Sequence, residues 1–148
     1  MSSKFLIHAL LTGSLFYASC GNNTVDTSNK AESRTISRAN YLEVFAFHGT
    51  RQCETCKNMK ANTRETLETY FKDQLKDSLI VFRIVDVDLE ENAKLAEKFQ
   101  ATGTALMVNR VIDGKDHIED LSDFAFDKAN NAQEFIPELK QKITTLIQ

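Results

Sequence analysis

The chain has 148 residues, of which 42% are hydrophobic and 26% are charged. These values are typical of one globular domain with a single core. The formal net charge is -3, and the chain has no cluster of Lys and Arg of the kind that nucleic-acid binding requires. We therefore expect no nucleic-acid partner.

Residues 1–19 have the pattern of a secretory signal peptide: a basic start, an apolar run over residues 5–18 and small residues at its end. The run is too short to span a bilayer. The segment Ala18-Ser19-Cys20 resembles the bacterial lipobox, in which cleavage precedes a cysteine that becomes acylated. The alternative, ordinary cleavage near Ala18, would leave Cys20 as an unpaired thiol among three cysteines. We therefore predict an exported lipoprotein of the bacterial cell envelope, anchored to the membrane through Cys20 and facing the periplasm.

Residues 20–39 are rich in Ser, Thr, Asn and charge, and Val25 and Ile36 are their only large apolar residues. Such a segment has too little apolar surface to offset the entropy lost on ordering. We predict that it is a flexible tether, and that residues 40–148 form one domain.

The first half of this domain reads as strand, helix, strand and helix. Residues 41–47 form an apolar, aromatic-rich run that predicts a strand buried on both faces, and residues 48–52 predict a loop. From Cys53, apolar residues recur at steps of three and four, which predicts a long helix. Its buried face is expected to carry Met59, Thr63, Leu67, Tyr70, Phe71 and Leu75. A second strand over 79–87 is followed by a short helix, capped by Asp88 or Asn92, that buries Ala93, Ala96 and Phe99.

The second half reads as a hairpin and a last helix. Residues 105–112 predict a third strand, and Asp113-Gly114 predicts a type I′ turn into a return strand over 117–121. An amphipathic helix follows over 132–147, with Pro137 either in its first turn or at a kink. Helical crossovers require parallel pairing, whereas the tight turn requires antiparallel pairing. The predicted fold is therefore α/β, a central mixed sheet with helices on both faces.

Cys53 and Cys56 lie three residues apart where the first strand gives way to a helix. At a helix start this spacing brings two sulfurs within disulfide reach. Unpaired N–H groups and the helix dipole there favour thiolate over thiol, so Cys53 is predicted to be the attacking thiol and Cys56 the resolving thiol. Arg51 would add to this effect and Glu54 would oppose it.

This element order, with Cys-x-x-Cys at a helix start, resembles the thioredoxin-like superfamily over residues 40–148. More narrowly, residues 47–56 together with residues 123–126 resemble small exported bacterial proteins known as ArsF-type subunits of a nitrophenyl-compound nitroreductase. The resemblance implies a thiol-redox partner protein.

Three positions depart from ordinary thioredoxins. The family usually has Trp where this chain has Gln52, and a buried acid in the first strand where it has Phe47. It also places a cis-proline at the start of the third strand, where this chain has Thr104-Ala105. The resemblance therefore implies an altered docking surface beside the cysteines, to which Thr104 would contribute chiefly through its backbone.

The remaining candidates have a functional and a structural interpretation. His48 would tune the Cys53 thiolate or shuttle a proton, or it is a solvated loop residue. Thr55 lies between the two cysteines and is predicted to support the pair. The pair itself would be a static disulfide if it does not cycle, or half of a metal site completed by His48 or His117. Three further residues are expected to pack in the core or in a lid rather than to line a substrate site: Leu121, Phe124 and Phe126.

The sequence thus predicts an exported thiol–disulfide oxidoreductase or redox adaptor. It would exchange electrons with protein thiols or disulfides, including those of a membrane redox partner, without an organic cofactor or a metal. The alternative is a non-catalytic subunit in which a structural disulfide supports a surface that docks a larger envelope or nitroreductase-like enzyme.

Overall fold

The computed structural model describes residues 40–148. The predicted signal peptide, the tether and Cys20 lie outside these residues. Within residues 40–148, four strands and five helices follow one another, with one short 3-10 turn. In order they are β1 (Asn40–His48), α1 (Glu54–Tyr70), α2 (Lys72–Lys76), β2 (Ile80–Asp86), the 3-10 turn η1 (Glu90–Asn92), α3 (Ala93–Phe99), β3 (Ala105–Ile112), β4 (Lys115–Asp120), α4 (Ser122–Lys128) and α5 (Ala132–Leu146).

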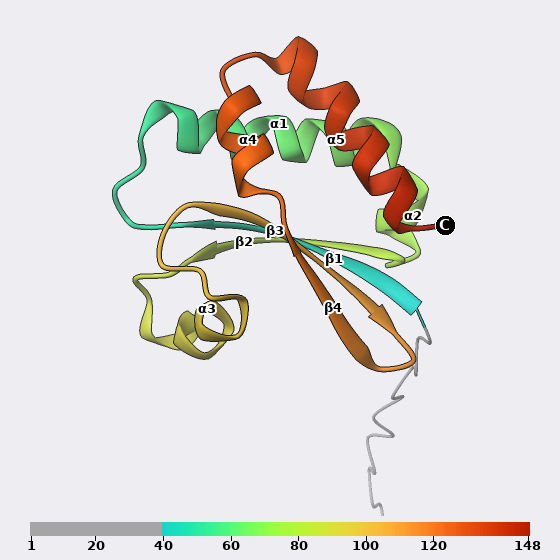
Figure 1. Ribbon diagram of the computed structural model, residues 1–148, viewed down its shortest axis with the longest axis horizontal. Coiled ribbons are helices and arrows are strands. Elements are labelled where there is room, and N and C mark those ends of the chain that lie inside the picture. The colour runs from blue at the N-terminus through green and yellow to red at the C-terminus, as the bar shows by residue number, and fades with distance from the viewer. Residues whose placement is uncertain (1–39) are drawn as a thin grey trace, which may run out of the picture. The chain divides into compact units, whose positions relative to one another are not determined.

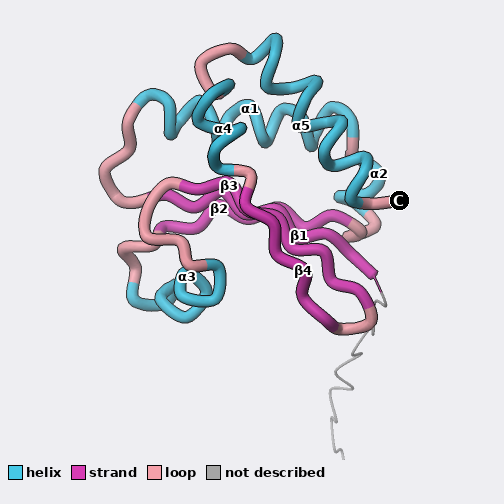
Figure 2. Tube along the Cα trace, viewed as in Figure 1, coloured by secondary structure: helices cyan, strands magenta, loops and turns pink. Residues whose placement is uncertain are grey.

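The strands form one mixed sheet in the order β2-β1-β3-β4. β1 and β2 are parallel, while β3 is antiparallel to both β1 and β4. One face of the sheet is covered by α1, α2, α4 and α5, and the other by α3 (Figure 1). The same arrangement is visible in the tube view, where the sheet separates the two helical layers (Figure 2). This order, with a central β1 and a C-terminal hairpin, is the thioredoxin-like fold that the sequence predicted.

Alternating side chains of β1 pack into two hydrophobic cores on opposite faces of the sheet, because successive side chains of a strand point to opposite faces. Leu42 and Val44 point into the larger cluster, which α1, α4 and α5 cover. Phe45 and Phe47 point the other way and pack with Phe99 of α3. The prediction that this strand is buried on both faces is therefore confirmed.

The predicted long helix is two helices. Phe71 adopts non-helical dihedrals, φ -129° and ψ 27°, between α1 and α2. This break turns its ring into the core, whereas Tyr70 is 45% exposed and lies under the Nζ of Lys140, 4.2 Å from the ring centroid. The expectation that Tyr70 belongs to the buried face was therefore wrong.

Further expectations differ in part from the structure. Asp88 does not cap α3, because its carboxylate binds the loop before Cys53, and Asn92 makes no capping bond although it stands at the N-cap. Ala93 is exposed rather than buried. Pro137 lies inside α5 beyond its first turn, and the alternative of a kink there stays a prediction. Phe126 is 43% exposed on α4, a helix that was not predicted, whereas Leu121 is buried and Phe124 packs against the core.

Candidate functional site

The two cysteines occupy the start of α1 and form a disulfide, with their Cα atoms 5.1 Å apart. Cys53 is the N-cap residue, in an extended conformation, and its side chain is exposed. Cys56 lies in the first turn of the helix and is only 6% exposed. Cys53 is therefore open to solvent while Cys56 is covered by the protein.

The backbone holds the sulfur of Cys53 at the helix end. The N–H of Cys56 donates a hydrogen bond to the Sγ of Cys53 at 3.2 Å. The N–H of Lys57 donates to the carbonyl oxygen of Cys53 at 3.1 Å, which begins the helical hydrogen bonding. The exposed sulfur thus lies against one of the N–H groups that have no partner inside a helix. A negative charge on this sulfur would be stabilised by that N–H and by the helix dipole.

The charged residues beside the pair are largely solvent-exposed. The Nζ of Lys57 lies 3.8 Å from an Oε of Glu54, with both side chains more than half exposed. This contact directs the Lys57 charge toward Glu54, and Arg51 is exposed as well. Exposed charges act through water and are screened by salt, so the backbone contact is the more direct influence on Cys53.

The loop that leads to Cys53 is attached to the end of β2. The N–H of Thr50 donates to the Oδ2 of Asp88 at 2.7 Å, and the N–H of Val87 donates to the carbonyl oxygen of His48 at 2.8 Å. A Cβ on Gly49 would lie 3.2 Å from that same carboxylate oxygen. The Thr50 hydrogen bond is the main cause that holds the pKa of Asp88 below its usual 3.8. The charged carboxylate of Asp88 therefore holds this loop in place.

Replacing Asp88 by Asn is expected to lower the stability of the protein at neutral pH, and the loss should shrink in acid. A carboxyl group whose pKa is depressed by folding stabilises the protein above its unfolded pKa, and this contribution disappears as the pH falls through the folded value. Urea unfolding should therefore show a gap between the free energies of unfolding of the wild type and the variant, and this gap should narrow below about pH 4. Glu91→Gln, which removes an exposed charge nearby, is the control. A gap that stays constant in acid would contradict this role of Asp88.

His48 lies at the end of β1, opposite Asp86 in the register with β2. Its Nδ1 is 2.9 Å from the carbonyl oxygen of Gly49 and 4.0 Å from the Oδ2 of Asp86, and the side chain is 12% exposed. The ring is therefore held at the strand end rather than solvated in a loop. Its predicted influence on Cys53 stays a prediction.

The residues that depart from the thioredoxin pattern lie together at this end of the sheet. Phe47 pairs with Ala105 across β1 and β3, and both are buried among apolar side chains. Thr104 precedes β3 and is half-buried. The Oε1 of Gln52 is buried and has no hydrogen-bond partner among the described residues. No cis peptide bond occurs in residues 40–148.

A contact that the sequence did not predict ties the start of α1 to the loop between α4 and α5. The Nδ2 of Asn130 donates to the Oγ1 of Thr55 at 3.2 Å, and its Oδ1 accepts from the Nδ2 of Asn58 at 3.1 Å. One turn further along α1, the Nδ2 of Asn62 donates to the carbonyl oxygen of Ala129 at 2.9 Å. Thr55, between the two cysteines, is thereby anchored from outside its own helix.

Asn130→Ala is expected to destabilise the protein by about 1 kcal/mol or less, because it removes two side-chain hydrogen bonds that are exposed to water. A double-mutant cycle with Thr55→Val, measured by urea unfolding, should give a coupling of about 0.5 kcal/mol or more. Purely additive effects of the two changes would show that the Asn130–Thr55 bond does not contribute.

Residues 40–148 contain neither a candidate metal site nor a candidate membrane-spanning helix. No group of three or more His, Cys, Asp and Glu side chains in residues 40–148 is placed to hold a metal ion. Within the same part of the chain, no helix combines the length and the apolar character needed to cross a membrane.

No protein-family model and no curated protein matches the chain. Among solved structures, it is similar to an X-ray structure of Fasciola hepatica thioredoxin, with 22% sequence identity and a TM-score of 0.40 over 66% of this chain and 80% of that one. The closer resemblance to nitroreductase subunits gains no support from these comparisons. The strand order and connections of residues 40–148, with the Cys53–Cys56 disulfide at the start of α1, make this part of the chain a domain of thioredoxin-like fold with CxxC-spaced cysteines.

Proposed function

We propose that the protein exchanges thiols and disulfides with a partner protein through Cys53 and Cys56. The observation that carries this proposal is the asymmetry of the pair. Cys53 is exposed at a helix N-terminus and its sulfur accepts the N–H of Cys56, while Cys56 is buried behind it. A partner sulfur has access to the first cysteine, and the second is placed to resolve the product.

In the reducing direction, the Cys53 thiolate attacks one sulfur of the partner's disulfide. A mixed disulfide forms, and the partner's other sulfur leaves as a thiolate that takes a proton from water. The Cys56 thiolate then attacks the Cys53 sulfur, so the bond between the two cysteines forms and the partner's second sulfur leaves. The partner gains two electrons and the cysteine pair loses two. The reverse sequence oxidises a partner dithiol, and neither direction needs an organic cofactor.

Equilibration of the purified protein with glutathione buffers tests whether the pair cycles. We expect a reduction potential within the range of exchange proteins, roughly -270 to -120 mV. Mass spectrometry after thiol alkylation would count reduced and oxidised molecules at each ratio. A pair that stays oxidised in strong reductant would instead identify a static structural disulfide and end this proposal.

The second candidate is a non-catalytic subunit that docks a larger enzyme. Phe47 favours it, because this buried position has no acid to transfer a proton during exchange. The nitroreductase-subunit resemblance belongs with this candidate. An insulin-reduction assay separates the two: turnover supports the oxidoreductase, whereas no turnover by a protein that still captures its partner supports the adaptor.

We also propose that Cys20 is acylated after removal of residues 1–19, so that the domain acts at a bacterial cell envelope. The apolar run, the small residues before Cys20 and the odd number of cysteines support this. Metabolic labelling with palmitate, in cells that make the wild type or Cys20→Ala, is the test. Label that persists in the variant would contradict the lipoprotein proposal.

A further inference from the structure

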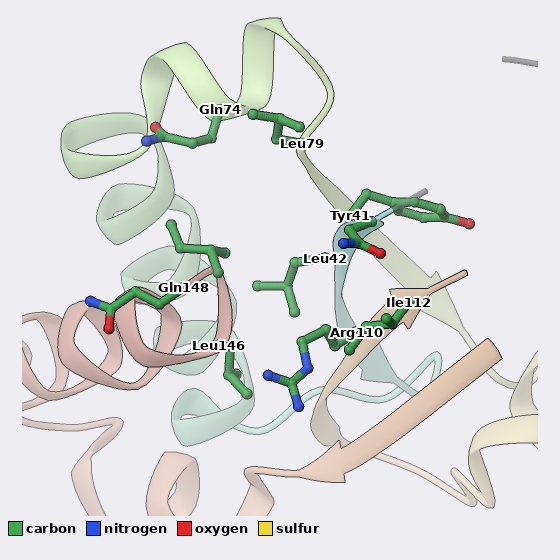
Figure 3. A pocket seen from close by; sticks show the side chains of 10 residues that line it. Tyr41, Leu42, Gln74, Leu79, Arg110, Ile112, Leu146 and Gln148 are labelled. Atoms are coloured by element: carbon green, nitrogen blue, oxygen red, sulfur yellow. The ribbon is translucent and has the colours of Figure 1, made fainter. Parts of the chain in front are cut away.

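A cavity lies at the end of β1 opposite the loop that leads to Cys53. It has a volume of about 340 Å³ and is bounded by the first residues of β1, the end of β3, α2 and the C-terminal end of α5. Figure 3 shows Leu42 on its floor, with Gln74 and Leu79 on one side and Leu146 on another. The volume falls within the range of small-molecule sites.

The cavity combines apolar walls with a single charged side chain. Leu42, Leu79, Ile112 and Leu146 are among its apolar lining residues, and Asn40, Gln74 and Gln148 add amide groups. Among the described residues that line it, only Arg110 has a charged side chain, and its guanidinium points into the hollow beside Leu146 (Figure 3). A largely apolar cavity with a few polar groups of fixed position is the usual design of a site for a small molecule.

The side chain of Arg110 has an unsatisfied hydrogen-bond donor. Arg110 is half-buried, and its Nε is buried with no hydrogen-bond partner among the described residues. No carboxylate of residues 40–148 forms an ion pair with it either. Its neighbours across the sheet are Leu42 and His117, neither of which supplies a negative charge. Since a guanidinium does not lose its proton, this N–H requires an acceptor from outside the domain.

We propose that this cavity binds the carboxylate of a single-chain amphiphile, such as a saturated fatty acid. The planar guanidinium of Arg110 matches a carboxylate, which accepts two parallel N–H bonds. Leu42, Leu79 and Leu146 would cover the first carbons of the acyl chain, and burial of each CH₂ favours binding. Inorganic phosphate has no acyl chain to cover these apolar walls, so it would lack the contribution of apolar burial.

This binding site is separate from the proposed redox chemistry. The cysteines follow the C-terminal end of β1, whereas Asn40 and Tyr41 at its N-terminal end line the cavity. Fatty-acid binding is therefore expected whether the cysteine pair is reduced or oxidised. A failure of the exchange assay would leave this inference intact, and a failure of the binding assay would leave the redox proposal intact.

Isothermal titration calorimetry of the purified protein with decanoate, below its micelle concentration, tests the inference. Decanoate should bind, while decyltrimethylammonium, acetate and inorganic phosphate should bind at least about tenfold more weakly, because each lacks the anion, the tail or the right headgroup. Arg110→Gln should weaken decanoate binding about tenfold or more. Arg83→Gln, an exposed arginine of β2 outside the cavity, is the matched control and should bind like the wild type.

Leu79→Glu gives a second variant, since Leu79 is 47% exposed and its replacement leaves the core intact. Its negative charge should repel decanoate and weaken binding, with an unchanged circular dichroism spectrum. Equal affinity of the wild type and Arg110→Gln, or no binding up to about 1 mM decanoate, would overturn the inference. If sedimentation velocity shows that the wild type forms dimers and that Leu79→Glu dissociates them, the cavity lies at a contact between two copies. That result would overturn the inference as well.

Discussion

Cys53→Ser is expected to abolish thiol–disulfide exchange, whereas Cys56→Ser is expected to stop at the mixed disulfide. The exposed sulfur of Cys53 is the one that a partner can reach, and the buried sulfur of Cys56 only releases the partner afterwards. The rate of insulin reduction should fall to the uncatalysed background in both variants. Non-reducing gels should show a covalent adduct with a disulfide-containing substrate for Cys56→Ser alone.

Loss of the disulfide also affects stability, and this contribution has to be measured separately. A disulfide that closes such a short loop is expected to contribute about 2 kcal/mol or less. Both single variants lose it equally, so urea unfolding should give them similar midpoints. If Cys53→Ser retained exchange, or if Cys56→Ser formed no adduct while remaining folded, the assignment of attacking and resolving cysteines would be wrong.

The sheet could be predicted because its signals are local. The apolar run over residues 105–112 coincides with β3, and Asp113 and Gly114 have φ of 51° and 74°, as a type I′ turn requires. The mixture of parallel and antiparallel pairing then followed from two rules of chain connection, the parallel crossover and the antiparallel hairpin. Each of these features depends on residues that are neighbours in sequence.

The helices were less predictable because tertiary packing decides where they end. Phe71 has an ordinary helical neighbourhood in sequence, yet its burial between α1 and α2 interrupts the helix. α4 left only a weak signal, the four-residue spacing of Leu121, Ala125 and Ala129, which are all buried. Phe124 and Phe126 nearby were instead expected to pack in the core or in a lid. Phe126 lies on the exposed side of the helix.

The candidate site also has a part that could be predicted from local sequence and a part that could not. The cysteine pair and its position at a helix start follow from a strand–loop–helix pattern within some fifteen residues. The groups that anchor this segment come from far along the chain. Asp88 binds Thr50 across 38 positions, and Asn130 binds Thr55 across 75. Neither partner is marked by its residue type, because Asp and Asn in loops are common for local reasons as well.

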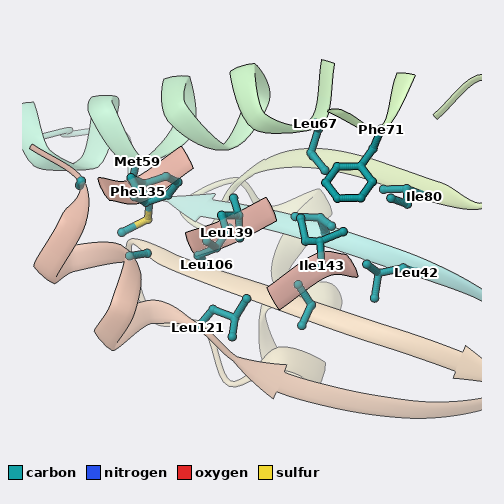
Figure 4. Packing of buried hydrophobic residues seen from close by; sticks show 14 residues of the cluster. Leu42, Met59, Leu67, Phe71, Ile80, Leu106, Leu121, Phe135, Leu139 and Ile143 are labelled. Atoms are coloured by element: carbon teal, nitrogen blue, oxygen red, sulfur yellow. The ribbon is translucent and has the colours of Figure 1, made fainter. Parts of the chain in front are cut away.

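Phe135→Ala is expected to produce the largest loss of stability of any single change considered. The ring is fully buried in the core between α5, α1 and the sheet, where Figure 4 places it beside Met59. It also contacts the ring of Phe124, with centroids 5.0 Å apart. Removing a buried Phe side chain forfeits its burial and leaves a cavity, at a cost of about 3–5 kcal/mol. Urea unfolding, monitored by far-ultraviolet circular dichroism, measures this loss.

Phe126→Ala is the matched control, because it makes the same chemical change nine residues away on an exposed surface of α4. Phe126 is 43% exposed, so its replacement should cost no more than about 1 kcal/mol. The two variants therefore test the packing of α4 and α5 against the sheet, since the sequence alone assigned Phe126 to core or lid packing. Similar losses of stability in both variants would mean that α4 presents a different face to the core. The surface beside Asn130 and Thr55 would then be placed differently as well.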